Sequence, residues 1–185
     1  MTHQAGGRRV SSAVTWGLLA AFIAHDLEEL VTMSSYTRRQ ARRLKERHPR
    51  VPDRVWSALE MDATHVATAI ALMGVLVGAA AADGARTGGR SGFYQTVLVG
   101  FGLHGVAHLG QSAAARGYTP GVVTSPGVIA FSLWAWRRLR REDLVPETGT
   151  RDLVSDAALF PVAILGVHGA AHGIRLLARR AVRRR

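Results

Sequence analysis

Histidine and acidic residues at helical spacing are the feature of this sequence most capable of chemistry. In the run His25-Asp26-Leu27-Glu28-Glu29, the two glutamates follow the histidine by three and four positions. A helix would therefore place His25, Glu28 and Glu29 on one face, while Asp26 and Leu27 would turn away from it. Imidazole nitrogens and carboxylate oxygens arranged in this way can bind a metal ion.

Similar pairs occur in three later segments. Asp62 and His65 are three positions apart, the spacing by which helix bundles present a carboxylate and an imidazole to a pair of metal ions. Glu60 lies about 140° around the same helix from His65, so we expect it at the rim of a site. Two histidine pairs with a spacing of four, each able to bind one ion or two adjacent ions, are His104 with His108 and His168 with His172.

The segments that carry these residues are close to the length of a membrane span. A spanning helix needs about 20 mostly apolar residues. Stretches without Lys, Arg, Asp or Glu cover 10–24, 63–82, 91–115, 117–136 and 157–174. The first reaches spanning length only by continuing through His25 to Leu30. An ionisable residue at membrane depth costs about 2.5 to 3.5 kcal/mol on insertion scales, so each one needs a partner or a function.

These segments predict an all-α fold, a polytopic membrane helical bundle of about five transmembrane helices in one integral membrane domain over 1–185. Helices are expected at about 10–33, 52–82, 91–116 and 152–175, and the fourth of the five follows a short break at 117–121 and ends at about 136. A basic linker covers 38–54 and a basic tail covers 175–185. The side with the linker and the tail carries more Lys and Arg than the other side. The positive-inside rule then places the N-terminus outside and the C-terminus in the cytoplasm.

Charge and cysteine content exclude several classes of protein. The net charge of +11 would suit nucleic-acid binding, but the apolar segments leave no soluble domain to perform it, so we expect the lipid bilayer as partner and no nucleic acid. The preference for arginine over the single lysine is typical of a GC-rich bacterial genome, which suggests a bacterial cytoplasmic membrane. The absence of cysteine excludes disulfides, iron–sulfur clusters and thiolate zinc sites.

The position of each motif along its helix predicts that the motifs lie at the same depth in the membrane and meet there. In an antiparallel bundle they must lie late in the first, third and fifth helices and early in the second, as they do here. The metal-ligand candidates are then His25, Glu28, Glu29, Asp62, His65, His104, His108, His168 and His172. One ion does not need nine ligands, so we predict two metal ions. Glycines beside the histidines, in the third helix and the fifth, should allow these helices to approach closely.

Several functions agree with nitrogen and oxygen ligands. Iron is favoured, while zinc and manganese suit the same donors. Two irons could activate dioxygen to hydroxylate or desaturate a lipophilic small molecule, with electrons from a donor protein. Two zinc ions would instead activate water, as in a hydrolase or isomerase. Haem is not expected, because carboxylate side chains lie at the same depth in the membrane as the histidines. A metal or proton transporter, or a non-enzymatic helper protein, is the third alternative, although the wholly apolar stretch 69–82 gives an ion path little support.

The motif at His25 resembles the signature of the HXXEE-motif membrane proteins. The region from His104 to His108, followed by Tyr118-Thr119-Pro120-Gly121-Val122, is similar to a histidine and Pro-Gly region of the same family, so the resemblance extends over most of the chain. It implies a multi-span membrane fold and important roles for His25, Glu28 and Glu29, and it implies no particular activity. Tyr118 and Thr119 would lie at the cytoplasmic end of the third helix, where they could contact a substrate or support the ligands.

Overall fold

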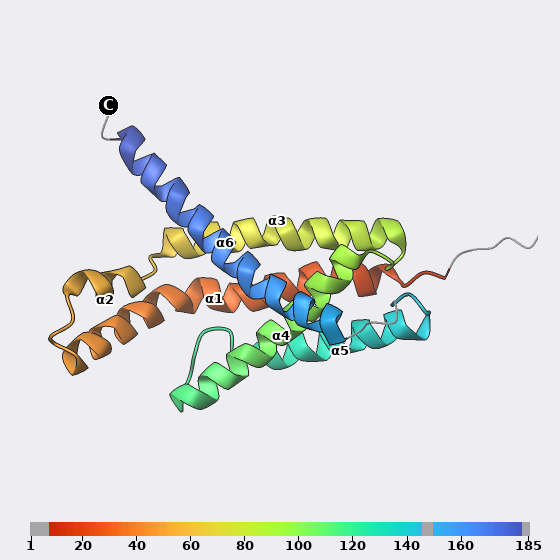
Figure 1. Ribbon diagram of the computed structural model, residues 1–185, viewed down its shortest axis with the longest axis horizontal. Coiled ribbons are helices and arrows are strands. Elements are labelled where there is room, and N and C mark those ends of the chain that lie inside the picture. Colours follow the sequence, from red (N-terminus) through yellow and green to blue (C-terminus); the bar gives the residue numbers. More distant parts are fainter. Residues whose placement is uncertain (1–7, 146–149, 183–185) are drawn as a thin grey trace, which may run out of the picture.

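The computed structural model describes residues 8–145 and 150–182, and within them the chain forms six helices and no strand. The all-α prediction is therefore confirmed. Figure 1 shows α1, α3 and α5 lying along the long axis of the molecule, with α4 and α6 inclined to it in opposite directions. The helices are α1 (Ser12–Arg47), α2 (Asp53–Leu59), α3 (Ala63–Thr87), α4 (Gly92–Ala115), α5 (Ser125–Arg141) and α6 (Thr150–Val182).

The hydrophobic core lies where α1, α3, α4 and α5 meet. Each of these helices contributes a fully buried side chain, namely Leu18, Val77, Leu98 and Leu139. The hydroxyl of Tyr94 on α4 also donates a hydrogen bond of 2.6 Å to a backbone carbonyl of α1. The relative positions of α1 and α4 are thus determined by the core.

Glycines set the distance between α4 and α5. A Cβ on Gly102 would lie 2.9 Å from the Cβ of Ser132, and one on Gly105 would lie 3.0 Å from Ile129. The predicted close approach is confirmed for this helix, because a larger residue would push the two helices apart. On α6 the prediction is wrong, since a Cβ at Gly166, Gly169 or Gly173 would meet nothing described within 4 Å.

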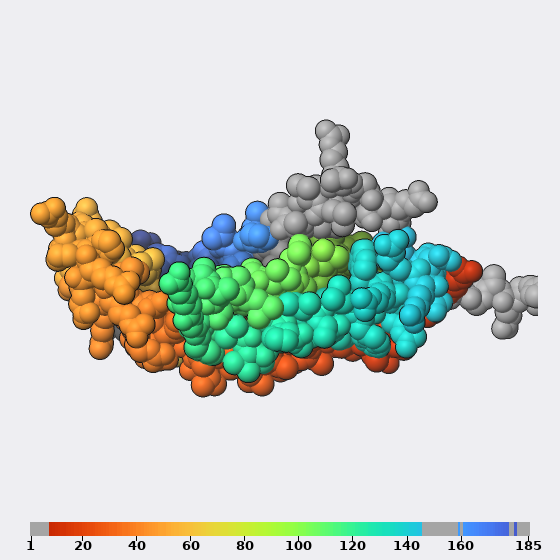
Figure 2. Space-filling model, turned by 90° about the horizontal axis from the view of Figure 1, so that it is seen from below, coloured from red at the N-terminus to blue at the C-terminus, as the bar shows by residue number. Residues whose placement is uncertain are grey.

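The first helix is much longer than predicted. We expected it to end near 33, but α1 continues through half of the basic linker to Arg47. Arginine, lysine and glutamine favour helices, and neither glycine nor proline occurs in residues 34–48. Lys45 and Arg47 in the last turn also interact favourably with the helix dipole. Figure 2 shows this end of α1 and the adjoining α2 projecting at one end of the molecule.

The single helix predicted over 52–82 is two helices. Asp62 caps the N-terminus of α3, and its carboxylate accepts a 2.8 Å hydrogen bond from the backbone N–H of His65. The backbone N–H of Met61 donates to the hydroxyl of Thr37 on α1 at 3.2 Å. A helix cannot continue through such a cap, because the aspartate side chain replaces a backbone acceptor. The predicted one-face geometry of Asp62 and His65 on a helix is therefore wrong.

The fourth predicted span corresponds to a short helix, α5. The charge-free stretch 117–136 was long enough for a span, with a break expected at 117–121, whereas α5 begins at Ser125, ends at Arg141 and has 17 residues. Before it the chain turns at Gly121, whose φ of 84° suits glycine. At about 1.5 Å per residue, a helix of this length extends about 25 Å, less than the thickness of the hydrocarbon core, about 30 Å.

Among the described residues, one helix, α3, is long and apolar enough to cross a membrane. A shorter apolar helical stretch covers Pro161–Leu177 within α6. The five spans and their orientation stay predictions. Residues 183–185 of the predicted basic tail lie outside the described residues.

Candidate metal centre

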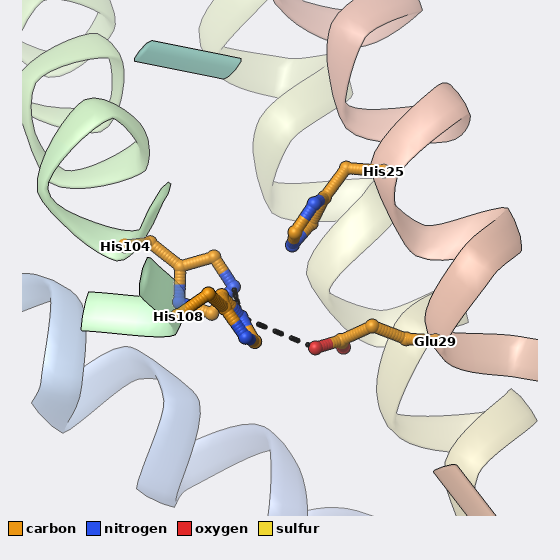
Figure 3. A group of neighbouring side chains, drawn as sticks. All are labelled: His25, Glu29, His104 and His108. Atoms are coloured by element: carbon orange, nitrogen blue, oxygen red, sulfur yellow. Dashed lines mark hydrogen bonds and ion pairs between the residues drawn. The ribbon is translucent and has the colours of Figure 1, made fainter. Parts of the chain in front are cut away.

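Four of the predicted ligands come together between α1 and α4. They are His25, Glu29, His104 and His108, and one ligand atom of each lies within 4.8 Å of the others. Figure 3 shows the three imidazoles and the carboxylate pointing toward one another. His25 and His108 are only 1% and 5% exposed, and the other two are partly buried. We call this group the three-histidine cluster.

The separations in the three-histidine cluster suit one metal ion. Nε2 of His108 lies 2.8 Å from Nε2 of His104 and 3.2 Å from Oε1 of Glu29. Two ligands about 2.0 to 2.1 Å from a tetrahedral ion stand roughly 3.3 Å apart. These two pairs are near that spacing, and all four ligand atoms lie within 4.8 Å of one another, so side-chain rotations could bring the four to one ion.

Thr124 determines which nitrogen of His25 carries the proton. Its Oγ1 lies 2.8 Å from Nδ1 of His25 and 2.8 Å from Oε2 of Glu28, and 3.3 Å from the carbonyl of Gly121. The carboxylate and the carbonyl can only accept, so the one hydroxyl proton is donated to them, and Nδ1 of His25 must donate to Thr124. Nε2 keeps its lone pair, and it is buried without a hydrogen-bond partner in the part of the chain that the structure describes. Imidazole binds metals in this form.

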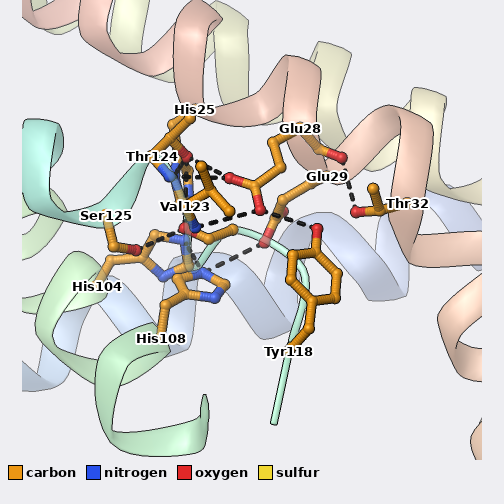
Figure 4. Close-up of polar contacts among 11 residues, drawn as sticks. His25, Glu28, Glu29, Thr32, His104, His108, Tyr118, Val123, Thr124 and Ser125 are labelled. Carbon is orange, nitrogen blue, oxygen red and sulfur yellow. Dashed lines mark hydrogen bonds and ion pairs between the residues drawn. The ribbon is translucent and has the colours of Figure 1, made fainter.

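Glu28 lies beside the three-histidine cluster and binds the loop before α5. Figure 4 shows its carboxylate among Tyr118, Val123 and Thr124. It accepts hydrogen bonds from the Tyr118 hydroxyl at 2.9 Å and from the backbone N–H groups of Val123 and Thr124 at 3.3 and 2.9 Å. A carboxylate at the start of α5 is also favoured by the helix dipole. Glu28 therefore positions the loop that carries Thr124.

The other four predicted ligands lie on α3 and α6, outside the three-histidine cluster. Nε2 of His65 is 3.0 Å from Nδ1 of His168, and their rings stack with centroids 5.3 Å apart. Asp62 caps α3 and forms an ion pair with Arg175. His172 is exposed. Sequence spacing had suggested one site for all nine residues, and the structure separates them into two groups.

A cavity of about 340 Å³ lies between α1, α3, α4 and α6 and reaches both groups. Glu29, His104 and His108 line it, and so does His168. Asp26, which we expected to turn away, is 8% exposed and also lines this cavity. The sequence does contain a signal for this position of Asp26. Asp26 precedes Glu29 by three residues, and this spacing places the two carboxylates on one face of α1.

The remaining sequence candidates have different surroundings. Tyr118 is 44% exposed and touches Glu28, which makes it part of the loop contact. Thr119 is buried, and its hydroxyl has no hydrogen-bond partner in residues 8–145 and 150–182. Glu60 is exposed at the end of α2.

Fold and site together define an all-helical protein with three histidines and a glutamate gathered between two helices. The chain belongs to the family of proteins of unknown function with an HXXEE motif, whose family model matches residues 16–135. This confirms the resemblance seen in the sequence. The match includes the three-histidine cluster and the loop held by Glu28, and it ends before α6. No curated protein and no solved structure matches the chain.

Proposed function

We propose that this protein is a membrane-embedded metalloenzyme, an oxidoreductase that acts on a lipophilic small molecule. The observation that carries the proposal is the three-histidine cluster in the wall of a largely apolar cavity. A catalytic ion needs protein ligands on one side and an open side for substrate or water. Glu29, His104 and His108 reach the cavity surface, so an ion held by them would be open to it.

Iron is the metal we propose. Histidine and carboxylate ligands with open positions are typical of non-haem iron oxygenases, although zinc and manganese suit the same donors. When bound, iron would supply dioxygen activation, with electrons from a donor protein. The chain itself would hold the ion through His25, Glu29, His104 and His108, and Thr124 keeps Nε2 of His25 unprotonated. Four donors are enough for one ion. For the second ion of our sequence prediction, Asp26 is a further carboxylate in the same cavity that could serve as a ligand.

Membrane embedding is part of the proposal. The helix α3 supports it, together with apolar side chains on the outside of other helices, among them Val31 on α1 and Leu165 on α6, which are 76% and 72% exposed. In the five-span arrangement the three-histidine cluster would lie in the half of the bilayer nearest the basic segment 38–54, the side we assign to the cytoplasm of a bacterium.

A zinc-dependent hydrolase or isomerase is the second candidate, and the observation that favours it is Asp26. A buried carboxyl group in the same cavity as the proposed ion could act as general base toward an attacking water. The oxidoreductase does not require such a base.

Metal analysis of the full chain, purified in detergent without chelators, tests these alternatives. We expect about one iron per chain, whereas zinc would support the second candidate and about two ions would restore a dinuclear centre. A folded protein with no bound metal, which also fails to take up iron or zinc added at micromolar concentration, would overturn the proposal. It would favour a transport or helper protein.

A further inference from the structure

The loop before α5, residues 117–124, is buried in its middle. Thr119, Pro120 and Gly121 are buried, whereas Gly117 and Tyr118 at its start are exposed. Loops usually run over the surface of a protein, because buried backbone groups need hydrogen-bond partners. The buried part of this loop therefore packs against particular residues of the interior.

Gly121 contacts two imidazoles of the three-histidine cluster. A Cβ at this position would lie 2.8 Å from Cε1 and Nδ1 of His108 and 2.9 Å from Cε1 of His25. Carbon atoms in good contact are about 3.5 to 4.0 Å apart, so a larger residue would overlap both rings. The φ of 84° also lies in the left-handed region, which favours glycine. The close approach and the backbone conformation thus both require glycine here.

Both imidazoles are held by other contacts. Nδ1 of His25 lies 2.8 Å from Oγ1 of Thr124, and Nε2 of His108 lies 3.2 Å from Oε1 of Glu29. A rotation of either ring away from Gly121 would break one of these contacts. The rings therefore cannot make room for a side chain without losing their positions in the cluster.

The backbone of the loop is held as well. The carbonyl of Gly121 accepts hydrogen bonds from the backbone N–H of Ser125 at 3.1 Å and from its hydroxyl at 2.7 Å, and Ser125 is fully buried. Glu28 binds the N–H groups of Val123 and Thr124. A side chain at position 121 would therefore have to displace either the loop or the imidazoles.

The loop and the cavity contact the three-histidine cluster at different places. The described residues that line the cavity include Glu29, His104 and His108, but neither His25 nor any residue of the loop. Figure 4 shows Thr124 of the loop beside His25. The loop thus covers His25, which is 1% exposed, where the cavity does not reach it.

We propose that Gly121 is a positioning residue of the metal centre, because its missing side chain allows the loop before α5 to pack on His25 and His108 and to hold both rings for an ion. The cavity is then the side from which a substrate reaches that ion. The inference deepens the proposed function and rests on it for the presence of the ion. The packing of the loop on His25 needs no ion.

Chemical modification of the histidines tests this packing in metal-free protein. Diethyl pyrocarbonate reacts with unprotonated imidazole nitrogens, and mass spectrometry of the full chain from lipid nanodiscs gives the rate at each histidine. We expect Gly121→Ala to increase the rate at His25 at least about tenfold and to leave the rate at His65 on α3 unchanged. An unchanged rate at His25, or an equal increase at His65, would overturn the proposal.

Gly88→Ala is the matched control for backbone strain. Gly88 also has a positive φ, of 66°, but the atoms nearest to a Cβ there belong to the side chain of Arg9, which is exposed and can move. We expect this variant to leave the rate at His25 unchanged. An equal increase in both variants would show that strain alone exposes His25, which contradicts the proposal.

If Gly121→Ala does not fold, Tyr118→Phe decides. This change removes a hydroxyl that donates to Glu28 from an exposed residue, so the loop should open more often and the rate at His25 should rise by about three- to tenfold. Tyr36→Phe, which removes a hydroxyl elsewhere on α1, is the control and should have no effect. Equal rates in the two variants would overturn the packing of the loop on His25.

Co²⁺ binding to the same proteins tests the positioning role. Gly121→Ala should bind Co²⁺ about 10- to 100-fold more weakly, with a changed visible absorption, whereas Gly88→Ala should bind it normally. Unchanged affinity and absorption in Gly121→Ala would overturn the positioning role and leave the proposed function standing. If the unaltered protein binds no metal although Gly121 protects His25, the packing stands and the proposed function fails.

Discussion

The histidine pairs on α4 and α6 have the same spacing but different surroundings. Nε2 of His108 meets His104 and Glu29 within 3.2 Å, and His25 completes a group of four. On α6, His168 contacts one histidine of α3, His65, and the second histidine of the pair, His172, is exposed. A spacing of four residues therefore makes a pair available, and the neighbouring helix decides whether it can bind metal.

The packing of the two helices explains the difference. Gly102 and Gly105 of α4 lie against α5, and Tyr94 donates a hydrogen bond to the backbone of α1, so α4 is held on two sides. A Cβ on the glycines of α6 would meet no described atom within 4 Å. Close packing on α4 brings a carboxylate and a third imidazole to its histidines, while α6 brings Arg175 to Asp62. A cation beside the acid disfavours metal binding there.

The largest effect is expected from breaking the α4 pair. His108→Ala removes the imidazole that contacts both His104 and Glu29, so bound metal should be lost, with an affinity at least about 100-fold weaker. The matched control is His172→Ala on α6, which should retain metal. Metal content and titration of the purified variants provide the measurement. Equal losses in both variants would mean that the two pairs serve one site.

A smaller effect is expected from Thr124→Val, which removes the acceptor for Nδ1 of His25. The ring could then adopt the tautomer with a proton on Nε2, so metal affinity should fall by about 10- to 100-fold. Thr124→Ser keeps the hydroxyl and should restore most of the affinity. Competition with a chelator of known affinity measures the change. Equal affinity in the valine and serine variants would show that the hydroxyl does not position His25.

Glu28→Gln should mainly reduce stability. The carboxylate accepts bonds from Tyr118 and from two backbone N–H groups, and a neutral amide accepts fewer and weaker ones. The free energy of unfolding should fall by about 1.5 to 2 kcal/mol. Thermal denaturation in detergent, compared with Glu46→Gln on the exposed end of α1, measures this. A full loss of metal with unchanged stability would instead make Glu28 a ligand.

Asp62→Ala should have the smallest effect. Loss of the cap on α3 should lower stability by about 1 kcal/mol, and metal content should not change. Asp62→Ser provides another capping side chain and should recover part of the stability. The same denaturation and metal assays apply. A reduced metal content in the alanine variant would place the α3 and α6 group at the metal centre after all.

Much of the local structure could be predicted from the sequence. The third predicted helix, 91–116, agrees with α4 within a residue at each end, because Ser91, a capping residue, precedes it and Gly117 follows it. Prediction from local sequence failed where the same residue could play either of two structural roles. Asp62 was expected to face a metal and instead caps α3. The arginines from 38 onward were expected to form a linker and instead continue α1 to Arg47.

The sequence by itself determined the helical class and the pairing of histidines and acids on shared helix faces, because the helix repeat is a property of the local backbone. Its lack of cysteine also restricted any metal to nitrogen and oxygen ligands. Only the tertiary structure decided that Glu29 joins the histidines of α4 while Glu28 binds the loop before α5. Such choices depend on how apolar helix surfaces far apart in the chain pack together, and residue spacing within one helix does not contain that information.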